Sequence, residues 1–238
     1  MAGHSKWSQI KHKKAKEDSK RGKLFTKLIK EITIVARMGG GDPAGNAKLR
    51  LLLEKAKEIN MPQDNSSRAI KRGTGEIPGQ SYESYMYEGY GPGNIAVIVE
   101  VLTDNKNRAI AEMRTVFTRK GGIIAQAGAV SWMFNKVGVI RIPEKSATEE
   151  TLLNLLIDHN IIDIRSEDNI TTITCDMASL DDIKQLLSEN NIKVESAEIE
   201  WVPQNTVSIS KENEEKAYEF LQALEDLDDV QNVYTNLG

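Results

Sequence analysis

The chain has 238 residues, enough for two or three small domains, and its single cysteine excludes an intramolecular disulfide. Apolar residues make up 39% of the sequence and charged residues 28%, which is typical of a soluble globular protein and excludes a disordered or fibrous one. The formal net charge of −4 averages two opposite regions, because residues 1–75 hold 18 Lys or Arg against 7 Asp or Glu. This net charge of +11, followed by −15 in the remainder, indicates a polyanion-binding module attached to an acidic body.

Other classes of protein have little support in the sequence. No apolar run approaches the roughly 20 residues that span a bilayer, and the first ten residues contain no apolar stretch typical of a secretory signal. Three histidines and one cysteine without close pairing build no zinc site, and no known nucleophile or hydrolase motif occurs. We therefore expect a cytoplasmic protein with no membrane partner, no metal, no cofactor, no catalytic residue and no enzymatic activity.

The first predicted helix combines an apolar stripe with a basic stripe. Apolar residues recur at helical spacing between residues 20 and 38, and the glycines at 39–41 end the helix. The opposite face carries Lys20, Lys23, Lys27, Lys30 and Arg37. We expect the four lysines to be exposed and to serve binding instead of folding.

Two further helices complete an N-terminal domain. Asn46 is placed to cap a helix that runs to about residue 59. Pro62 fits the first turn of a third helix, which Gly73 is expected to end. Residues 1–75 are thus predicted to form a basic tail and a three-helix domain.

The elements that follow the glycine-rich linker at 73–80 have the order of a ferredoxin-like split βαβ fold. The first half is a strand, a helix capped by Asp104 or Asn105, and a strand, at 94–102, 105–121 and 123–134. The second half is a strand, an acidic helix and a strand, at 206–210, 211–225 and 230–235.

The same order of elements is repeated between these halves. Strands are predicted at 137–142, 161–165, 170–175 and 193–202, with helices at 148–159, where Ser146 is at capping position, and after Ser179. This segment has a net charge of −8. We expect an inserted acidic domain at 136–203 within a discontinuous central domain of residues 81–135 and 204–238. The predicted class is α+β: an N-terminal three-helix domain plus two ferredoxin-like α/β domains, one inserted in the other.

The basic N-terminus is the main candidate site. Each Lys or Arg at a phosphate releases condensed counterions, and lysines suit contact with the nucleic-acid backbone better than base reading. The candidate nucleic-acid-binding residues are Lys6, Trp7, Lys11, His12, Lys13, Lys14, Lys16, Lys20, Arg21, Lys23, Lys27, Lys30 and Arg37. The plainer alternative is that these charges only keep a small domain soluble.

Three aromatic residues allow two interpretations each. Trp7 could stack on an exposed base, or it could bury its ring and anchor the tail on the helical domain. Tyr87 and Tyr90 stand in the glycine-rich stretch YEGYGPG, where they could contact nucleic acid or a partner from a loop. They could equally cover a sheet edge beside a turn.

Long stretches of the chain also match a known family. They are MAGHSKWSQIKHKKAKEDSKRGKLFTKLIKEIT, GGGDPAGNAKLR, NMPQDNSSRAIKRGTGE and YEGYGPGNIAVIVEVLTDNKNR. The chain resembles the YebC/PmpR family of bacteria over essentially its whole length, a group similar to the mitochondrial translational activator of cytochrome c oxidase. The resemblance implies three domains and no enzymatic activity. Members are described both as transcriptional regulators that bind promoter DNA and as ribosome-associated factors that assist translation through proline-rich stretches.

The residues favour one of these two roles. No helix-turn-helix is recognised, and few arginines or amides are placed for major-groove reading, which favours recognition of backbone or shape. We expect a monomeric regulator that binds ribosomal RNA, with the ribosome as a partner, and that assists translation. The alternative is a transcriptional regulator that binds promoter DNA. A protein-only adaptor that works through the acidic insert would leave the N-terminal charge unexplained.

Overall fold

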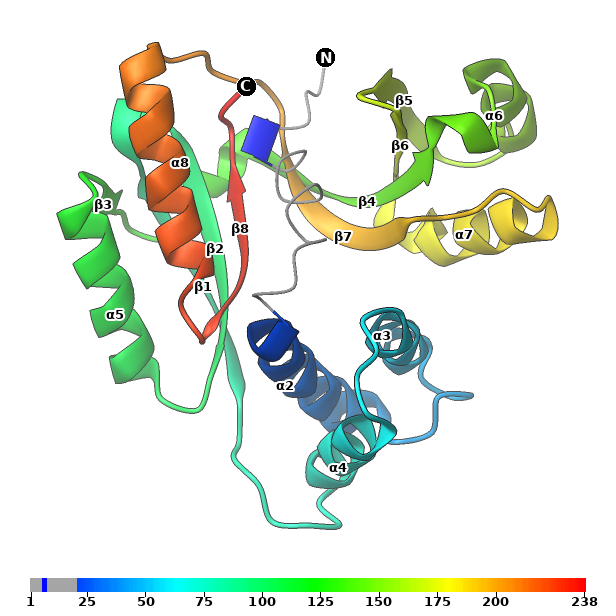
Figure 1. Ribbon diagram of the computed structural model, residues 1–238, viewed down its shortest axis with the longest axis horizontal. Helices are drawn as coiled ribbons and strands as arrows, with labels where there is room; N and C mark the ends of the chain where they lie inside the picture. The colour runs from blue at the N-terminus through cyan, green and yellow to red at the C-terminus, as the bar shows by residue number, and fades with distance from the viewer. Residues whose placement is uncertain (1–5, 8–20) are drawn as a thin grey trace. The chain divides into compact units, whose positions relative to one another are not determined.

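The computed structural model describes residues 6–7 and 21–238, which divide into two compact units (Figure 1). The inserted unit covers residues 131–206, and the predicted inserted domain at 136–203 falls inside it. The main unit contains the remaining described residues up to Leu237, so the N-terminal helices and the central sheet belong to one unit. No helix of the described residues is both long and apolar enough to cross a bilayer.

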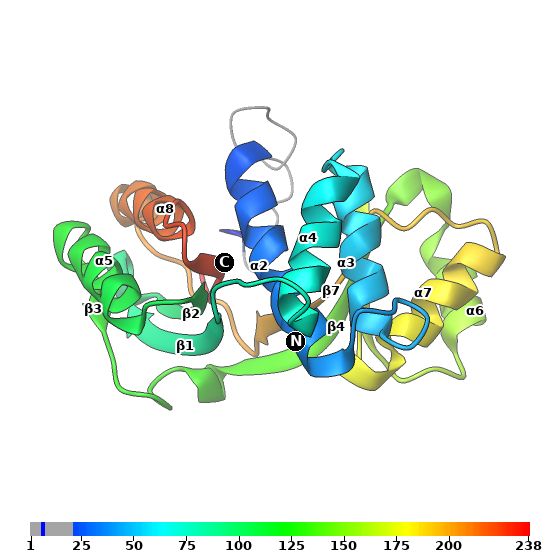
Figure 2. The ribbon, with the colours of Figure 1, turned by 90° about the horizontal axis from the view of Figure 1, so that it is seen from below.

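Three helices form the N-terminal part of the main unit: α2 (Arg21–Gly39), α3 (Ala47–Glu58) and α4 (Gln63–Thr74). Figure 2 shows them side by side. Their core consists of Leu28, Ile32, Val35, Leu49, Leu52, Ala56, Met61 and Ala69. The Asn46 side chain accepts from Leu49 N and caps α3 as predicted, and Gly75, with a φ of 82°, ends α4 two residues later than expected. The three-helix prediction is confirmed.

The central sheet has the strand order β3-β1-β2-β8 and is antiparallel throughout. Its strands are β1 (Glu83–Tyr90), β2 (Ala96–Thr103), β3 (Ile123–Ile124) and β8 (Val230–Thr235). Helices α5 (Lys106–Arg119), capped by Asn105, and α8 (Lys211–Glu225) cover one face of it (Figure 2). Val97, Val99 and Val101 of β2 pack there against Phe117 and Phe220, whose rings meet edge to face at 4.9 Å.

The prediction of a strand at 206–210 is wrong. The chain there makes one isolated parallel bridge, between Val207 and Leu237, and the sheet position that it was expected to fill is occupied by β1. Tyr85 and Tyr87, two residues apart on β1, both pack against the core, as expected for a strand with one buried face. Gly89, which suggested a turn, is needed inside this strand because a Cβ there would lie 2.5 Å from the Ile123 carbonyl oxygen.

The inserted unit is a regular ferredoxin-like domain. Its strands β4 (Phe134–Pro143), β5 (Ile161–Glu167), β6 (Ile170–Cys175) and β7 (Ser196–Pro203) form an antiparallel sheet in the order β5-β6-β4-β7. Helices α6 (Glu149–Leu156) and α7 (Leu180–Glu189) pack on one face. The α+β class with two such sheets is confirmed, although Thr148, and not Ser146, caps α6. The strand predicted at 123–134 shortens to β3, and a 3-10 helix at Ser131–Met133 precedes β4.

The inserted unit is expected to be removable. Phe134 and Pro203 are register partners on β4 and β7, so the chain enters and leaves this unit side by side. The two cores of the main unit draw no residue from 131–206. Replacing residues 137–202 with a short Gly/Ser link should therefore leave a chain that unfolds cooperatively by circular dichroism. An unfolded product would contradict these boundaries.

Candidate nucleic-acid interface

Much of the predicted basic tail lies outside the residues that the structure describes. Six of the candidate residues lie outside the described residues: Lys11, His12, Lys13, Lys14, Lys16 and Lys20. Arg21 begins α2, and its side chain is likewise outside the description. The described candidates are Lys6, Trp7, Lys23, Lys27, Lys30 and Arg37 of the N-terminal region, with Tyr87 and Tyr90 of β1.

Trp7 is an anchor, and the interpretation as a stacking platform is wrong for this structure. Only 2% of the residue is exposed, and it belongs to the core of the central domain. Its ring centroid lies 6.1 Å from that of Tyr218 on α8. The anchoring interpretation therefore holds, with the central domain as the support instead of the helical domain that we expected.

Lys6 reinforces this attachment. Its Nζ lies 2.8 Å from Glu214 Oε1 on α8, and its backbone N–H donates to the Leu237 carbonyl at 2.9 Å. The hydrogen bond from Lys6 holds the pKa of the Glu214 carboxyl below its ordinary value, and the same bond raises the pKa of Lys6. Both side chains remain partly exposed, so solvent screens the pair and most of the anchoring comes from the Trp7 ring.

The lysines of α2 do not form a free exposed stripe. Lys23 Nζ donates to the Asp226 carbonyl at 2.8 Å, and Lys27 Nζ donates to the Glu225 carbonyl at 2.9 Å. These carbonyls end α8, where backbone oxygens lack partners within the helix and the helix dipole favours a cation. Lys23 and Lys27 thus join the helical domain to α8. The prediction of exposure holds for Lys23 and is wrong for the half-buried Lys27, and the role of these lysines in binding stays a prediction.

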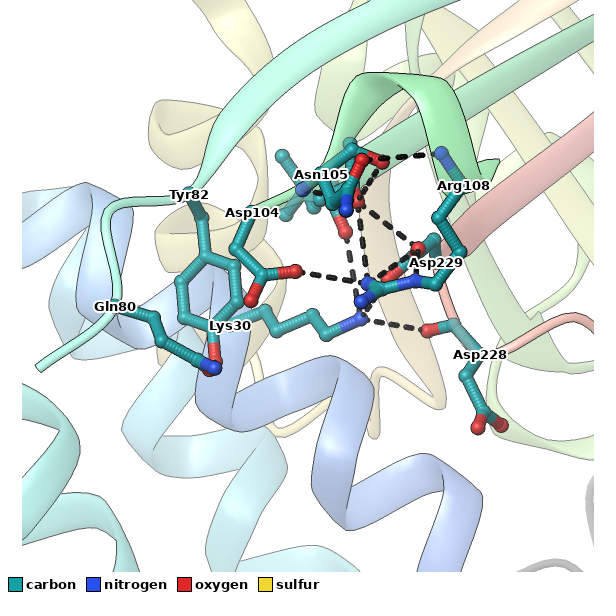
Figure 3. A network of polar contacts seen from close by, with 10 residues as sticks. Lys30, Gln80, Tyr82, Asp104, Asn105, Arg108, Asp228 and Asp229 are labelled. Carbon is teal, nitrogen blue, oxygen red and sulfur yellow. Dashed lines mark hydrogen bonds and ion pairs between the residues drawn. The ribbon is translucent and has the colours of Figure 1, made fainter. Parts of the chain in front are cut away.

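Lys30 is the most buried of the described lysines of α2, since only 7% of the residue is exposed. Its Nζ lies 2.7 Å from Asp229 Oδ1 and donates to the Asp228 carbonyl at 2.8 Å. Asp229 Oδ2 accepts from Arg108 Nη2 at 2.8 Å and from Thr103 Oγ1 at 2.9 Å (Figure 3). One carboxylate therefore connects α2, β2, α5 and the start of β8.

The Asp229 network keeps its carboxylate charged. Burial alone would raise the pKa of Asp229, but the hydrogen bonds from Lys30, Arg108 and Thr103 outweigh it and hold the pKa below its ordinary value. Asp104 Oδ1 also pairs with Arg108 Nη2 at 2.8 Å and so balances the second cation. We name these five residues the Asp229 network, which holds the main unit together.

The two tyrosine candidates are also structural. Tyr87 lies on β1 and packs against the central core, where burial raises its pKa. Tyr90, at the end of the same strand, donates its hydroxyl to the Ala129 carbonyl at 3.3 Å. Both tyrosines lie on a strand and not on a loop, which corrects the expected loop. β3 pairs with β1 only at Gly89 and Tyr90, so Tyr87 lies on a stretch of β1 whose one partner among the described strands is β2, as expected at a sheet edge.

The exposed cations of the described helical domain lie mostly on α3 and α4. They are Lys48, Arg50, Lys55, Lys57, Arg68, Lys71 and Arg72, together with Lys23 and Arg37 of α2. Over residues 21–75 the sequence has twelve Lys or Arg and five Asp or Glu, a net charge of +7. The cations of α3 and α4 were counted in the sequence without being singled out, although exposure on a helix with an opposite apolar face was a usable signal.

The described residues show little that resembles a catalytic centre. Among them, no group of three or more His, Cys, Asp or Glu side chains is arranged to hold a metal ion. Cys175 is buried in the inserted unit, and burial raises the pKa of its thiol to about 11, so that it is protonated near neutral pH.

Comparisons with known proteins agree with this architecture. A family profile described as the TACO1/YebC protein N-terminal domain matches residues 5–76, and one described as the TACO1/YebC second and third domain matches residues 82–237. A probable transcriptional regulatory protein of Chlorobaculum tepidum is 49% identical over 238 residues, all of this chain and 95% of that protein. One of Chloroherpeton thalassium is 51% identical with the same coverage. The crystal structure of a conserved hypothetical protein from Aquifex aeolicus has 44% identity and a TM-score of 0.89, over 98% of this chain and 97% of that one.

Proposed function

The chain belongs to the TACO1/YebC family, and we propose that it is a non-enzymatic regulator of gene expression that binds nucleic acid through its N-terminal domain. In this proposal it acts in the cytoplasm as a monomer, associates with ribosomal RNA or the ribosome, and assists elongation through proline-rich stretches. The relatives carry the name of probable transcriptional regulatory proteins, which agrees with regulation of gene expression.

The observation that carries the proposal is the concentration of exposed cations on the helical domain. Residues 21–75 have a net charge of +7, whereas the chain after residue 75 has a net charge of −15. On α4, Arg68, Lys71 and Arg72 are exposed and have no ion pair with any described residue. Exposed cations collected on one domain attract a polyanion, and the acidic remainder repels it, so binding is directed to the helical domain.

RNA is preferred to DNA because the sequence contains no recognised helix-turn-helix and few arginines or amides placed for major-groove reading. The exposed side chains of the described helical domain include nine lysines and arginines, which suit contact with phosphates. The alternative is a transcriptional regulator that binds promoter DNA, and the names of the relatives favour it. The same cations would bind a DNA backbone, so the target has to be found by experiment.

Sedimentation of the cellular protein on sucrose gradients tests the translation role. The protein is expected to comigrate with ribosomal particles at moderate salt, and to move to the top of the gradient after treatment with ribonuclease or at high salt. Deoxyribonuclease is the matched control and should leave its position unchanged. A pool that is free of ribosomal particles at every growth stage and salt concentration would contradict the translation role and favour promoter DNA.

A further inference from the structure

We propose that the exposed face of α4, together with Arg37 of α2, is the surface on which the phosphate backbone of an RNA strand docks. This surface, here called the α4 basic face, consists of Arg37, Arg68, Lys71 and Arg72. The inference rests on the proposed function and assigns it to a place other than the lysines of α2. Those lysines are already engaged with α8 and Asp229.

The three cations of α4 point in one direction. At about 100° per residue, Arg68, Lys71 and Arg72 fall within a sector of roughly 100° on the helix. Ser66, Ala69 and Gly73 lie on the opposite side and are buried. The three α4 residues of the face therefore form a compact row of positive charge along the exposed side of the helix, and all three are exposed.

No carboxylate of the residues that the structure describes forms an ion pair with this row. Asp64 precedes Arg68 by four residues, a spacing that allows an ion pair within a helix, yet neither residue has an ion pair with another described side chain. Lys23 and Lys30 on α2, by contrast, lie within 4.0 Å of a carboxylate. An external anion would therefore gain the full attraction of the α4 cations without breaking an ion pair of the described chain.

Lys71 and Arg72 are also not required to finish the helix. Basic residues are common in a last helical turn because they interact with the unpaired carbonyls there. In α4 the Lys71 carbonyl already accepts from Glu76 N at 2.9 Å and from Ile77 N at 3.3 Å, and the Arg72 carbonyl accepts from Gly75 N at 3.3 Å. The backbone thus ends the helix by itself, which leaves both side chains available for a ligand.

The linker after α4 holds two of the three arginines of the face, Arg37 and Arg72, in place. Gly79 packs so closely on the stem of Arg72 that a Cβ at this position would lie 2.9 Å from Arg72 Cγ. Two residues later, Ser81 Oγ accepts from Arg37 Nη1 at 2.8 Å. Arg37 and Arg72 are consequently held along the same short segment, with less side-chain entropy left to lose when a phosphate binds.

The test measures binding of a fluorescein-labelled 30-nucleotide poly(U) RNA by anisotropy over a series of salt concentrations. The variant Arg68→Gln/Lys71→Gln/Arg72→Gln removes three positive charges and preserves helix propensity. If each cation contacts one phosphate, the slope of log K against log salt should shrink by about 2, and affinity at 0.1 M salt should fall on the order of 100-fold. Circular dichroism melting should coincide with that of the wild type, since exposed substitutions cost little stability.

The matched control is Lys120→Gln/Lys211→Gln/Lys216→Gln, which removes the same charge from two exposed positions of α8 and from the exposed residue after α5. It should weaken binding by less than about 3-fold, because salt screens distant charges. If the wild type binds neither poly(U) nor duplex DNA in a salt-dependent way, the proposed function itself fails. If the wild type binds but the α4 variant loses no more than the control, or loses only duplex DNA, the α4 basic face is not the RNA-docking surface and the proposed function stands.

Discussion

An Asp229→Asn variant is expected to lose about 3–5 kcal/mol of unfolding free energy, because breaking a buried ion pair leaves the partner cation without compensation. Lys30 is as buried as Asp229, and its ammonium would keep only carbonyl and amide oxygens as acceptors. An asparagine also presents two N–H donors where Arg108 and Thr103 now donate to a carboxylate. Urea unfolding, followed by circular dichroism on the chain that lacks residues 137–202, measures the loss in the main unit alone.

Asp226→Asn is the matched control for this prediction. It makes the same substitution at the exposed partner of Lys23, whose Nζ lies 3.8 Å from Asp226 Oδ1, and should change stability by less than about 1 kcal/mol. Equal losses in the two variants would mean that the Asp229 network does not hold the main unit together.

The same carboxylate predicts how stability depends on pH. Because the pKa of Asp229 is lower in the folded chain than its ordinary value, its contribution is present above about pH 4 and is lost as the pH falls through the folded pKa. The wild type and Asp229→Asn should therefore differ most near neutral pH and converge in acid. A difference that is unchanged down to pH 2 would contradict a lowered pKa.

A Trp7→Ala variant is expected to destabilise the main unit by about 3–5 kcal/mol, since it removes a large, fully buried side chain from a packed core. Trp7→Phe should cost much less, because it keeps an aromatic ring and the indole N–H has no hydrogen-bond partner in the structure. Urea unfolding measures both losses. Trp132→Ala, at a residue that is 67% exposed in the inserted unit, is the matched control and should be nearly neutral.

The Trp7 variants also separate anchoring from stacking. A tryptophan that stacks on a base contributes about 1–3 kcal/mol to binding and little to folding. The buried ring predicts the reverse: Trp7→Phe should bind RNA with the affinity of the wild type under conditions in which both are folded. Loss of RNA affinity with unchanged stability would place the ring outside the core and contradict the structure.

Elements with strong local signals could be predicted well from the sequence. The helix at Lys211–Glu225 and the strand at Val230–Thr235 have the predicted bounds, since an acidic amphipathic pattern identifies the helix and a short run rich in valine, tyrosine and threonine identifies the strand. The sequence predicted a strand at 206–210 and missed the one at 83–90 for a physical reason. Both segments alternate, and which of them pairs with β2 depends on packing against residues far away in the chain.

The candidate site was harder to predict because one helix does not reveal its partners. Periodicity identified the apolar and basic faces of α2, but Lys30 and Asp229 are 199 residues apart, and only the folded chain brings them together. When a second element covers the polar face of a helix, the sequence pattern of that helix does not distinguish a buried cation from an exposed one. The cations of α4 are exposed, and the sequence indicated them only through the net positive charge of residues 1–75.

The packing partners of Lys6 and Trp7 determine when these two residues can be attached during synthesis. Trp7 packs among residues 95–117 and 217–237, and the Lys6 N–H donates to Leu237, the penultimate residue. Synthesis proceeds from the N-terminus, so Lys6 and Trp7 leave the ribosome long before residues 217–237, which support them. These two residues therefore remain unattached through most of synthesis and are fixed only after that support has emerged.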